Sequence, residues 1–335
     1  MIRTFVCWNC CGLSIESSKY EEMCPNCSSR MTRRSWSIDE IRELDSDAKI
    51  IRGQCQDFVG VGSLRSQEPE LLSYAISRNY VQKALEHNVA ILFARERDVD
   101  GVRDTPMSFV LTEQPECDFF LFHNYLIKET DFYGVSSPSS ISSLAFVHPT
   151  AYICGLDITI EQGAEIGANV YIKDEVYIRE DTRISHGTVI GIPGARLISR
   201  LDGTRFQALH GGGVYIGRDV FVGANSVIVK SMWRRPTSIG DNTYIGNLVN
   251  IGHNCQIGNN VTVLPGAILC GSVAVGDGAT IGPGAIVGNG LSVGQNAIVT
   301  MGAVVTKDVG VGETVSGNFA IPHDRLIKHV KDLAI

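Results

Sequence analysis

Residues 239–257 read Ile239-Gly-Asp-Asn-Thr-Tyr-Ile245-Gly-Asn-Leu-Val-Asn-Ile251-Gly-His-Asn-Cys-Gln-Ile257, with an isoleucine at every sixth position. No α-helix has a period of six, and the alternation of an ordinary strand would not single out every third inward position. Such a period is typical of short strands that are each followed by a turn, with three strands to a coil. The aliphatic residues then fill the interior, and glycine or asparagine takes turns that need a positive φ. This stretch therefore predicts a left-handed parallel β-helix in a mainly β protein.

The same period extends along most of the C-terminal half of the chain. It accounts for three runs of aliphatic residues: Ile160, Ile166, Ile172, Ile178, Ile184 and Ile190; Ile216, Val222 and Ile228; and every sixth residue from Ile239 to Val311. Two irregularities interrupt it, since the step from Ile228 to Ile239 is eleven residues and the segment 191–213 has no repeat. Long loops on rigid scaffolds are commonly functional, so we expect 191–213 to leave the coil and to contribute to function.

The remaining sequence predicts three further parts. Residues 35–146 alternate strand-like and helix-like segments and are interpreted as a small α/β domain, which ends at the serine-rich segment 136–143. The β-helix domain is placed at 147–318, and a short C-terminal helix is expected at 319–335. Residues 1–34 are interpreted as a separate zinc ribbon on the evidence of their cysteines.

Two C-x-x-C motifs, Cys7-Trp-Asn-Cys10 and Cys24-Pro-Asn-Cys27, lie thirteen residues apart in this first segment. Each motif presents two thiolates from one tight turn, and four sulfurs form the tetrahedral set that structural zinc prefers. Such a metal would supply folding energy to a segment too short to bury a core. A redox-active dithiol and simple burial of the thiols are the alternatives, and Cys11 offers a substitute for Cys10 as a ligand.

The overall composition restricts the partners of the chain. The net charge of −7 over 335 residues argues against nucleic acid, because a phosphate backbone requires a basic face. No run of about 18 apolar residues predicts a membrane span. The first cysteine comes too early for a signal peptide, and the clustered cysteines fit a reducing compartment, so we expect a cytoplasmic protein.

Among eight histidines, His186 and His253 both follow an inward aliphatic residue by two positions and should face outward at the edge of a coil. A neutral imidazole beside amide side chains can accept a proton near pH 7, and His253 has more amides around it. Four alternatives stay open at this point. They are His186 as the base, a structural role, a zinc ion held between subunits by His186, His210 and His253 as in β-helices that hydrate carbon dioxide, and a non-catalytic scaffold.

The segment Asn250-Ile-Gly-His253-Asn-Cys-Gln-Ile-Gly258 resembles the active-site signature of the UDP-3-O-acylglucosamine N-acyltransferases, the N-acyltransferases of lipid A synthesis. The resemblance covers residues 37 to about 328. It includes the stretch Leu72 to Tyr80, which is similar to the uridine-binding stretch of the family. From spacing alone, Tyr74 and Tyr80 read as half-buried packing residues, but the resemblance implies that the two rings hold the base of a nucleotide.

The resemblance also implies roles for residues of the β-helix. His253 would be the general base that deprotonates the amine of a nucleotide-linked amino sugar as it attacks an acyl thioester. Asn247 and Asn250 would orient this acceptor, and the backbone N–H of Gly271 would hold the developing oxyanion. The family implies a homotrimer with sites between subunits.

The sequence departs from the family pattern at several places. The ribbon is foreign to it, Gly191-Ile-Pro-Gly194 replaces a Gly-Phe-Gly sequence, and a second family histidine is replaced near Gly290. The stretch 302–320 looks more like hexapeptide acetyltransferases that use coenzyme A. The expected donor is therefore an acyl-CoA or an acyl-carrier protein, and the product belongs to lipid A or another surface polysaccharide. O-acetyl transfer remains an alternative activity.

Overall fold

A computed structural model describes residues 3–6, 14–17, 22–23, 30–33, 35–64, 70–87, 89–134, 136–317, 323–325 and 331. The first four segments are β1 (Arg3–Val6), β2 (Ser14–Ser17), β3 (Glu22–Met23) and β4 (Arg30–Arg33), which form one antiparallel sheet. The proposed zinc ligands Cys7, Cys10, Cys24 and Cys27 all lie outside the described residues. Most of the expected C-terminal helix does too, although 323–325 and 331 are helical.

The α/β domain is built on a five-stranded sheet of order β6-β11-β10-β9-β8. Its strands are β6 (Lys49–Ile51), β8 (Gly60–Val61), β9 (Leu71–Tyr74), β10 (Val89–Ala94) and β11 (Ser108–Leu111). β10 lies at the centre, parallel to β9 and β11, and all six of its residues are buried. An uninterrupted apolar run is what a strand covered on both faces requires.

Two α-helices pack against this sheet, α1 (Arg78–Leu85) and α2 (Pro115–Lys128). Shorter elements complete the domain: the 3-10 helices η1 (Ile38–Glu43) and η2 (Glu96–Asp98), and the strands β5 (Trp36–Ser37) and β7 (Asp57–Phe58), which pair with each other. α2 buries three phenylalanines, Phe119, Phe120 and Phe122, and supplies much of the core.

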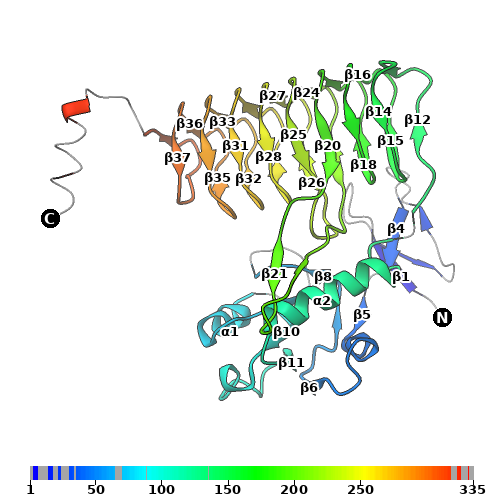
Figure 1. Cartoon of the computed structure of the whole chain (residues 1–335), viewed down its shortest axis with the longest axis vertical. Helices are drawn as coiled ribbons and strands as arrows, with labels where there is room; N and C mark the ends of the chain where they lie inside the picture. Colours follow the sequence, from blue (N-terminus) through cyan, green and yellow to red (C-terminus); the bar gives the residue numbers. More distant parts are fainter. Residues whose placement is uncertain are drawn as a thin grey trace.

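The C-terminal half is the expected left-handed parallel β-helix, with three sheets of short strands stacked in register (Figure 1). The first sheet holds β12 (Ser140–Ile141), β15 (Ile158–Ile160), β18 (Val176–Ile178), β23 (Val214–Ile216), β26 (Thr237–Ile239), β29 (Gln256–Ile257), β32 (Ala274–Val275) and β35 (Ser292–Val293). The second sheet holds β13 (Phe146–Val147), β16 (Glu165–Ile166), β19 (Arg183–Ile184), β24 (Phe221–Val222), β27 (Tyr244–Ile245), β30 (Thr262–Val263), β33 (Thr280–Ile281), β36 (Ile298–Val299) and β38 (Thr314–Val315). The third sheet holds β14 (Tyr152–Ile153), β17 (Tyr171–Ile172), β20 (Val189–Ile192), β25 (Val227–Val229), β28 (Asn250–Ile251), β31 (Ile268–Leu269), β34 (Ile286–Val287) and β37 (Val304–Val305).

The hexapeptide pattern explains this architecture residue by residue. The aliphatic residue that ends most strands points inward, and from Ile160 to Val305 these residues join one continuous core. Many corners use Asn or Asp with a positive φ, as at Asn242 and Asn260. Corner side chains also accept hydrogen bonds from backbone amides of the preceding coil. Asp241 Oδ1, for example, accepts from Arg218 N at 2.9 Å. The first coil starts at β12, inside the segment that composition indicated as a linker.

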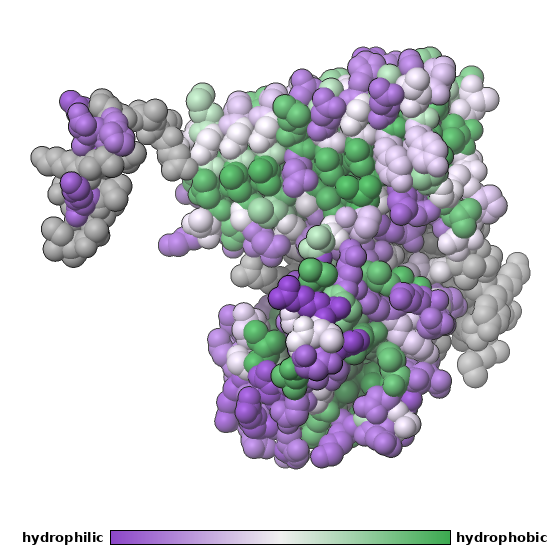
Figure 2. Space-filling model, in the orientation of Figure 1, coloured by the Kyte–Doolittle hydropathy of each residue, from purple (hydrophilic) through white to green (hydrophobic). Residues whose placement is uncertain are grey.

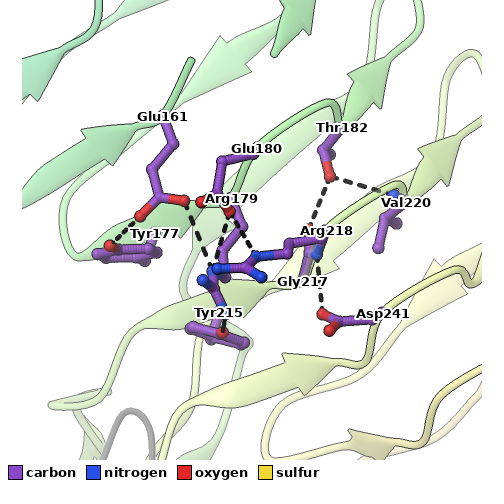
Figure 3. A network of polar contacts seen from close by, with 10 residues as sticks. All are labelled: Glu161, Tyr177, Arg179, Glu180, Thr182, Tyr215, Gly217, Arg218, Val220 and Asp241. Atoms are coloured by element: carbon purple, nitrogen blue, oxygen red, sulfur yellow. Dashed lines mark hydrogen bonds and ion pairs between the residues drawn. The ribbon is translucent and has the colours of Figure 1, made fainter. Parts of the chain in front are cut away.

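Polar contacts link successive coils on the outside of the first sheet (Figure 3). Arg179 Nε lies 3.5 Å from Glu161 Oε2 and 3.4 Å from Glu180 Oε2, and Arg218 Nε lies 2.7 Å from Glu180 Oε2. The hydrogen bond with Glu161 lowers the pKa of Glu180 to about 2, and the two arginines act in the same direction. Because these groups are partly exposed, each pair contributes at most about 1 kcal/mol to stability.

Two segments leave the β-helix at the corner between the third and the first sheet and hold the α/β domain (Figure 1). One is the loop 191–213, which contains the hairpin β21 (Leu197–Ser199) and β22 (Arg205–Gln207). The other is the turn 231–236, where the hexapeptide step is short and where Trp233 stacks on Phe120 of α2 with ring centroids 6.0 Å apart. No helix among the described residues combines the length and the apolar character needed to cross a membrane.

Candidate active site

His253, Gly271 and Asn289 lie one above the other at the corner between the third and the first sheet, which we call the third corner. The spacing of one coil is 18 residues here, so each of the three occupies the same place in its own coil. The loop 191–213 and the turn 231–236 leave the β-helix at this same corner in the two preceding coils. The architecture thus places the irregular segments next to His253.

His253 follows β28, is half-buried, and has its protonation pattern fixed by Asn254. Its Nδ1 lies 2.8 Å from Asn254 Oδ1. The same Oδ1 accepts from Met232 N at 3.1 Å, while Asn254 Nδ2 donates to Ser231 Oγ at 2.6 Å, so the orientation of the amide follows from the network. An amide oxygen can only accept, so Nδ1 of His253 carries the proton and Nε2 keeps a free lone pair.

The Nε2 atom of His253 lies against Gly271. A Cβ atom added at Gly271 would overlap Nε2, and it would lie 2.5 Å from Cε1 of His253 and 3.0 Å from Asn289 Oδ1. The absence of a side chain at Gly271 therefore makes room for the imidazole. Among the described residues, no acceptor receives a hydrogen bond from Gly271 N, so this N–H is free to bind an oxyanion.

His210, at the end of the loop 191–213, packs on His253 with ring centroids 5.6 Å apart and an interplanar angle of 81°. Only 7% of its surface is exposed. Burial lowers the pKa of His210 to about 3, and the neighbouring His253 acts in the same direction. Burial also lowers the pKa of His253, opposed by the hydrogen bond to Asn254 and assisted by the charge of Arg196. Both imidazoles are therefore neutral near pH 7.

The two tyrosines of the predicted base-binding pair have different surroundings. Tyr74, at the end of β9, packs on Phe119 of α2 with centroids 4.9 Å apart and the rings tilted by 40°, and its hydroxyl accepts from Arg196 Nη2 at 3.0 Å. Burial raises the pKa of Tyr74 to about 12. Tyr80 lies on α1 with 42% of its surface exposed and Lys83 Nζ 5.4 Å from its ring centre. The binding role of both tyrosines stays a prediction.

The two predicted acceptor-binding asparagines lie on or beside the third sheet and are exposed. Asn250 begins β28 and points outward, between Val227 and Ile268 of the neighbouring strands. Asn247 lies at the opposite edge of this sheet, at the corner before β28, where its Oδ1 accepts from Ala224 N at 2.8 Å. Of the two, only Asn250 lies on the strand that His253 follows, β28. The role of both residues stays a prediction.

The alternative of a zinc ion held by three histidines requires His186 to join His210 and His253. His186 instead follows β19 in the second sheet, at a different corner, and its Nδ1 accepts from Ala168 N at 2.9 Å. No cluster of three potential metal ligands occurs among the residues that the structure describes. Within one chain the three histidines therefore do not converge on one site.

Of three neighbours of His253, only His210 was considered from sequence, as a possible zinc ligand, and Asn254 and Arg196 were given no role. Asn254 stands in the motif itself, but its role depends on hydrogen bonds to the short turn at Ser231 and Met232. His210 and Arg196 belong to the loop, whose folding against α2 no repeat encodes. Arg196 Nη2 pairs with Glu116 Oε1 at 2.6 Å as well as with Tyr74, and so links α2 to the neighbourhood of His253.

Two family models match parts of the chain. They are the hexapeptide repeat of succinyl-transferase over residues 213–247 and the GMPPB C-terminal domain over residues 232–335. Among solved structures, a UDP-N-acetylglucosamine acyltransferase from Francisella novicida is 25% identical, with 56% of this chain and 73% of that chain covered and a TM-score of 0.36. The acetyltransferase domain of PglB from Neisseria gonorrhoeae is 18% identical, with 75% and 98% covered and a TM-score of 0.24.

Curated relatives match the chain at higher sequence identity. A UDP-3-O-acylglucosamine N-acyltransferase from Coxiella burnetii is 31% identical over 278 residues, which cover 72% of this chain and 74% of the relative. The protein UDP-3-O-acylglucosamine N-acyltransferase 1 from Francisella tularensis is 35% identical over 126 residues, which cover 36% and 34%. Since the likeness to the Coxiella protein extends well beyond the repeat, this chain is an acyltransferase that belongs to the UDP-3-O-acylglucosamine N-acyltransferase family.

Proposed function

We propose that this protein transfers an acyl group from a thioester, either acyl-CoA or acyl-carrier protein, to the amine of a nucleotide-linked amino sugar. The product would serve the synthesis of lipid A or of another surface polysaccharide. One observation carries the proposal: Nε2 of His253, with its lone pair free, lies against Gly271, whose N–H has no acceptor among the described residues. A base and an oxyanion donor thus border the same small space.

This pair of groups is suited to acyl transfer. Nε2 of His253 takes a proton from the sugar amine as the amine nitrogen attacks the thioester carbonyl. The carbonyl oxygen becomes an oxyanion, which the N–H of Gly271 stabilises. The C–S bond then breaks, the leaving thiolate takes the proton from the imidazolium, and an amide and a free thiol remain. A pKa of His253 held below its ordinary value keeps the base unprotonated at neutral pH.

The acceptor would be held by residues on both domains. In this proposal Tyr74 and Tyr80 bind the base of the nucleotide, and Asn247 and Asn250 orient the sugar. The link from Tyr74 through Arg196 to the surroundings of His253 supports a substrate that extends from the α/β domain to the third corner. A nucleotide sugar has this extended form.

We also propose a homotrimer with its sites between subunits. The outward positions of the third sheet form an apolar band along the β-helix (Figure 2), which includes Val227, Ile268, Ile286 and Val304. Ile268 is 37% exposed and Val304 51% exposed, and the polar Asn250 interrupts the band next to His253. An exposed apolar band of this kind is typical of a surface that another subunit covers.

A structural zinc ion bound by Cys7, Cys10, Cys24 and Cys27 completes the proposal. The four thiols are the donor set that zinc prefers, and the motif spacing lets each pair come from one turn. The zinc has no part in the transfer step.

The proposal is tested by measuring thiol release from an acyl thioester in the presence of a UDP-linked amino sugar. We expect His253→Ala to abolish turnover, while His186→Ala, which changes the equivalent position of another corner, keeps it. Thermal shift with UDP, dTDP and coenzyme A checks binding separately. An unshifted melting temperature with all three, together with no thiol release, would favour a non-catalytic scaffold.

A further inference from the structure

The proposed transfer step leaves His210 without a role, although this side chain is nearly buried and packs on the proposed base. We propose that His210 is a positioning residue: its ring covers His253, keeps water from it and holds Nε2 against Gly271. The inference rests on the proposed function, in which His253 is the base. It adds a residue of the loop 191–213 to a site otherwise built from the β-helix.

His210 is held in place by a closure of the loop on itself. Gly194, near the start of the loop, donates its N–H to His210 Nε2 at 3.3 Å, and Gln207 Nε2 donates to Gly194 O at 3.4 Å. Because Nε2 of His210 accepts, the proton of this neutral ring resides on Nδ1. The bonds join the two ends of the loop directly beside His253.

The α/β domain then fixes the closed loop from the outside. Asn124 of α2 donates to Gln207 O and accepts from Leu209 N, both at 2.9 Å. His123 Nε2 lies 2.9 Å from Leu209 O, which can only accept, so this nitrogen is protonated and Nδ1 accepts from Tyr133 OH at 3.0 Å. Two residues of one helix, His123 and Asn124, therefore hold the backbone of the residues that precede His210. The position of His210 is set by the α/β domain as much as by the β-helix.

The charges around the two histidines favour a neutral pair. Burial lowers the pKa of His210, so it does not compete with His253 for the proton of the amine. Arg196 on the loop lowers the pKa of His253, and Lys230, which is ion-paired with Glu175, lies near His210. Removal of the His210 ring would admit water and weaken the largest effect on His253, which is burial. The pKa of His253 would then rise toward its ordinary value of 6.5.

This inference is tested without any substrate by carbethoxylation of His253 with diethyl pyrocarbonate, which reacts with the neutral imidazole. The rate at the His253 peptide is followed by mass spectrometry across the pH range. In His210→Ala we expect faster modification and a midpoint at higher pH. In His210→Phe, which keeps an aromatic cover, we expect slow modification with the midpoint of the wild type. Wild-type rate and midpoint in His210→Ala would overturn the inference.

Turnover provides the second measurement. Because a displacement of a catalytic group by about 1 Å costs on the order of 10²-fold in rate, we expect a kcat loss of that order in His210→Ala with little change in KM. His186→Ala serves as the control and should match the wild type in both measurements. Activity retained in His253→Ala would refute the proposed function itself. An inactive His253→Ala together with a fully active His210→Ala would refute only the role of His210.

Discussion

Substitution of Gly271 by alanine perturbs the candidate site with a single methyl group. The backbone of Gly271 does not have the positive φ that requires glycine, so alanine adds no backbone strain there. The new Cβ would overlap Nε2 of His253 and lie 2.5 Å from its Cε1. Ordinary carbon contacts need about 3.5 Å or more, so the imidazole must move by about 1 Å.

The movement of the imidazole has few available directions. His210 packs on the ring, and Asn254 holds Nδ1 by a hydrogen bond of 2.8 Å. A displacement of about 1 Å in a reacting group lowers the rate on the order of 10²-fold. The added methyl group also obstructs the approach of a thioester oxygen to the N–H of Gly271. We therefore expect Gly271→Ala to lower kcat by at least about 10²-fold.

Stability should change only moderately in this variant. Overpacking costs about 1–3 kcal/mol, and here the obstacle is a half-buried side chain rather than the backbone. Steady-state thiol release measures kcat, and a thermal melt measures stability. Gly317→Ala is the control, because no atom of the described residues lies within 4 Å of its added Cβ atom. Wild-type kcat in Gly271→Ala would refute the placement of His253 and Gly271 around one reacting centre.

Further substitutions test the surroundings of the site. Trp233→Ala should lower the free energy of unfolding by about 3–5 kcal/mol in a urea titration, because the ring is 7% exposed and packs on Phe120; a loss below about 1 kcal/mol would contradict this packing. Burial lowers the pKa of His123 to about 4, so the unfolded chain binds a proton that the folded chain does not between pH 6.5 and 4. Stability should fall by about 3 kcal/mol as the pH drops through this interval, and His123→Gln should show a smaller slope; an unchanged slope would refute this assignment. Metal analysis of the purified full chain should find one zinc per chain, and the absence of zinc would end the ribbon hypothesis.

The β-helix was predictable because each coil repeats the same local rule. An inward aliphatic residue every six positions and a turn residue between them are sufficient to specify the stack.

The start of the β-helix was less evident. Ile141, Val147 and Ile153 keep the spacing of six, but the step from Ile153 to Ile160 is seven. The extra residue is accommodated near Gly155, which has a positive φ of 113°, and the predicted boundary at 147 left out β12, the first strand of the first coil.

The candidate site was predictable only in part. His253 and Gly271 follow from the repeat and from the family motif, because their corner is periodic. His210 and Arg196 could not be placed, since the loop 191–213 folds on contacts with residues 70 or more positions earlier. The bond between His123 and Leu209 spans 86 positions, and the bond between Arg196 and Tyr74 spans 122. No local pattern encodes such contacts, whereas a structure shows them directly.

We propose that the protein joins an acyl group to the amine of a nucleotide-linked amino sugar with His253 as the base. The most direct test is mass spectrometry of the product after incubation of an acyl thioester with a UDP-linked amino sugar, in parallel for the wild type and His253→Ala. We expect an amide-linked acyl group on the nucleotide sugar with the wild type and none with His253→Ala. An ester-linked product, or equal amounts of amide from both proteins, would contradict it.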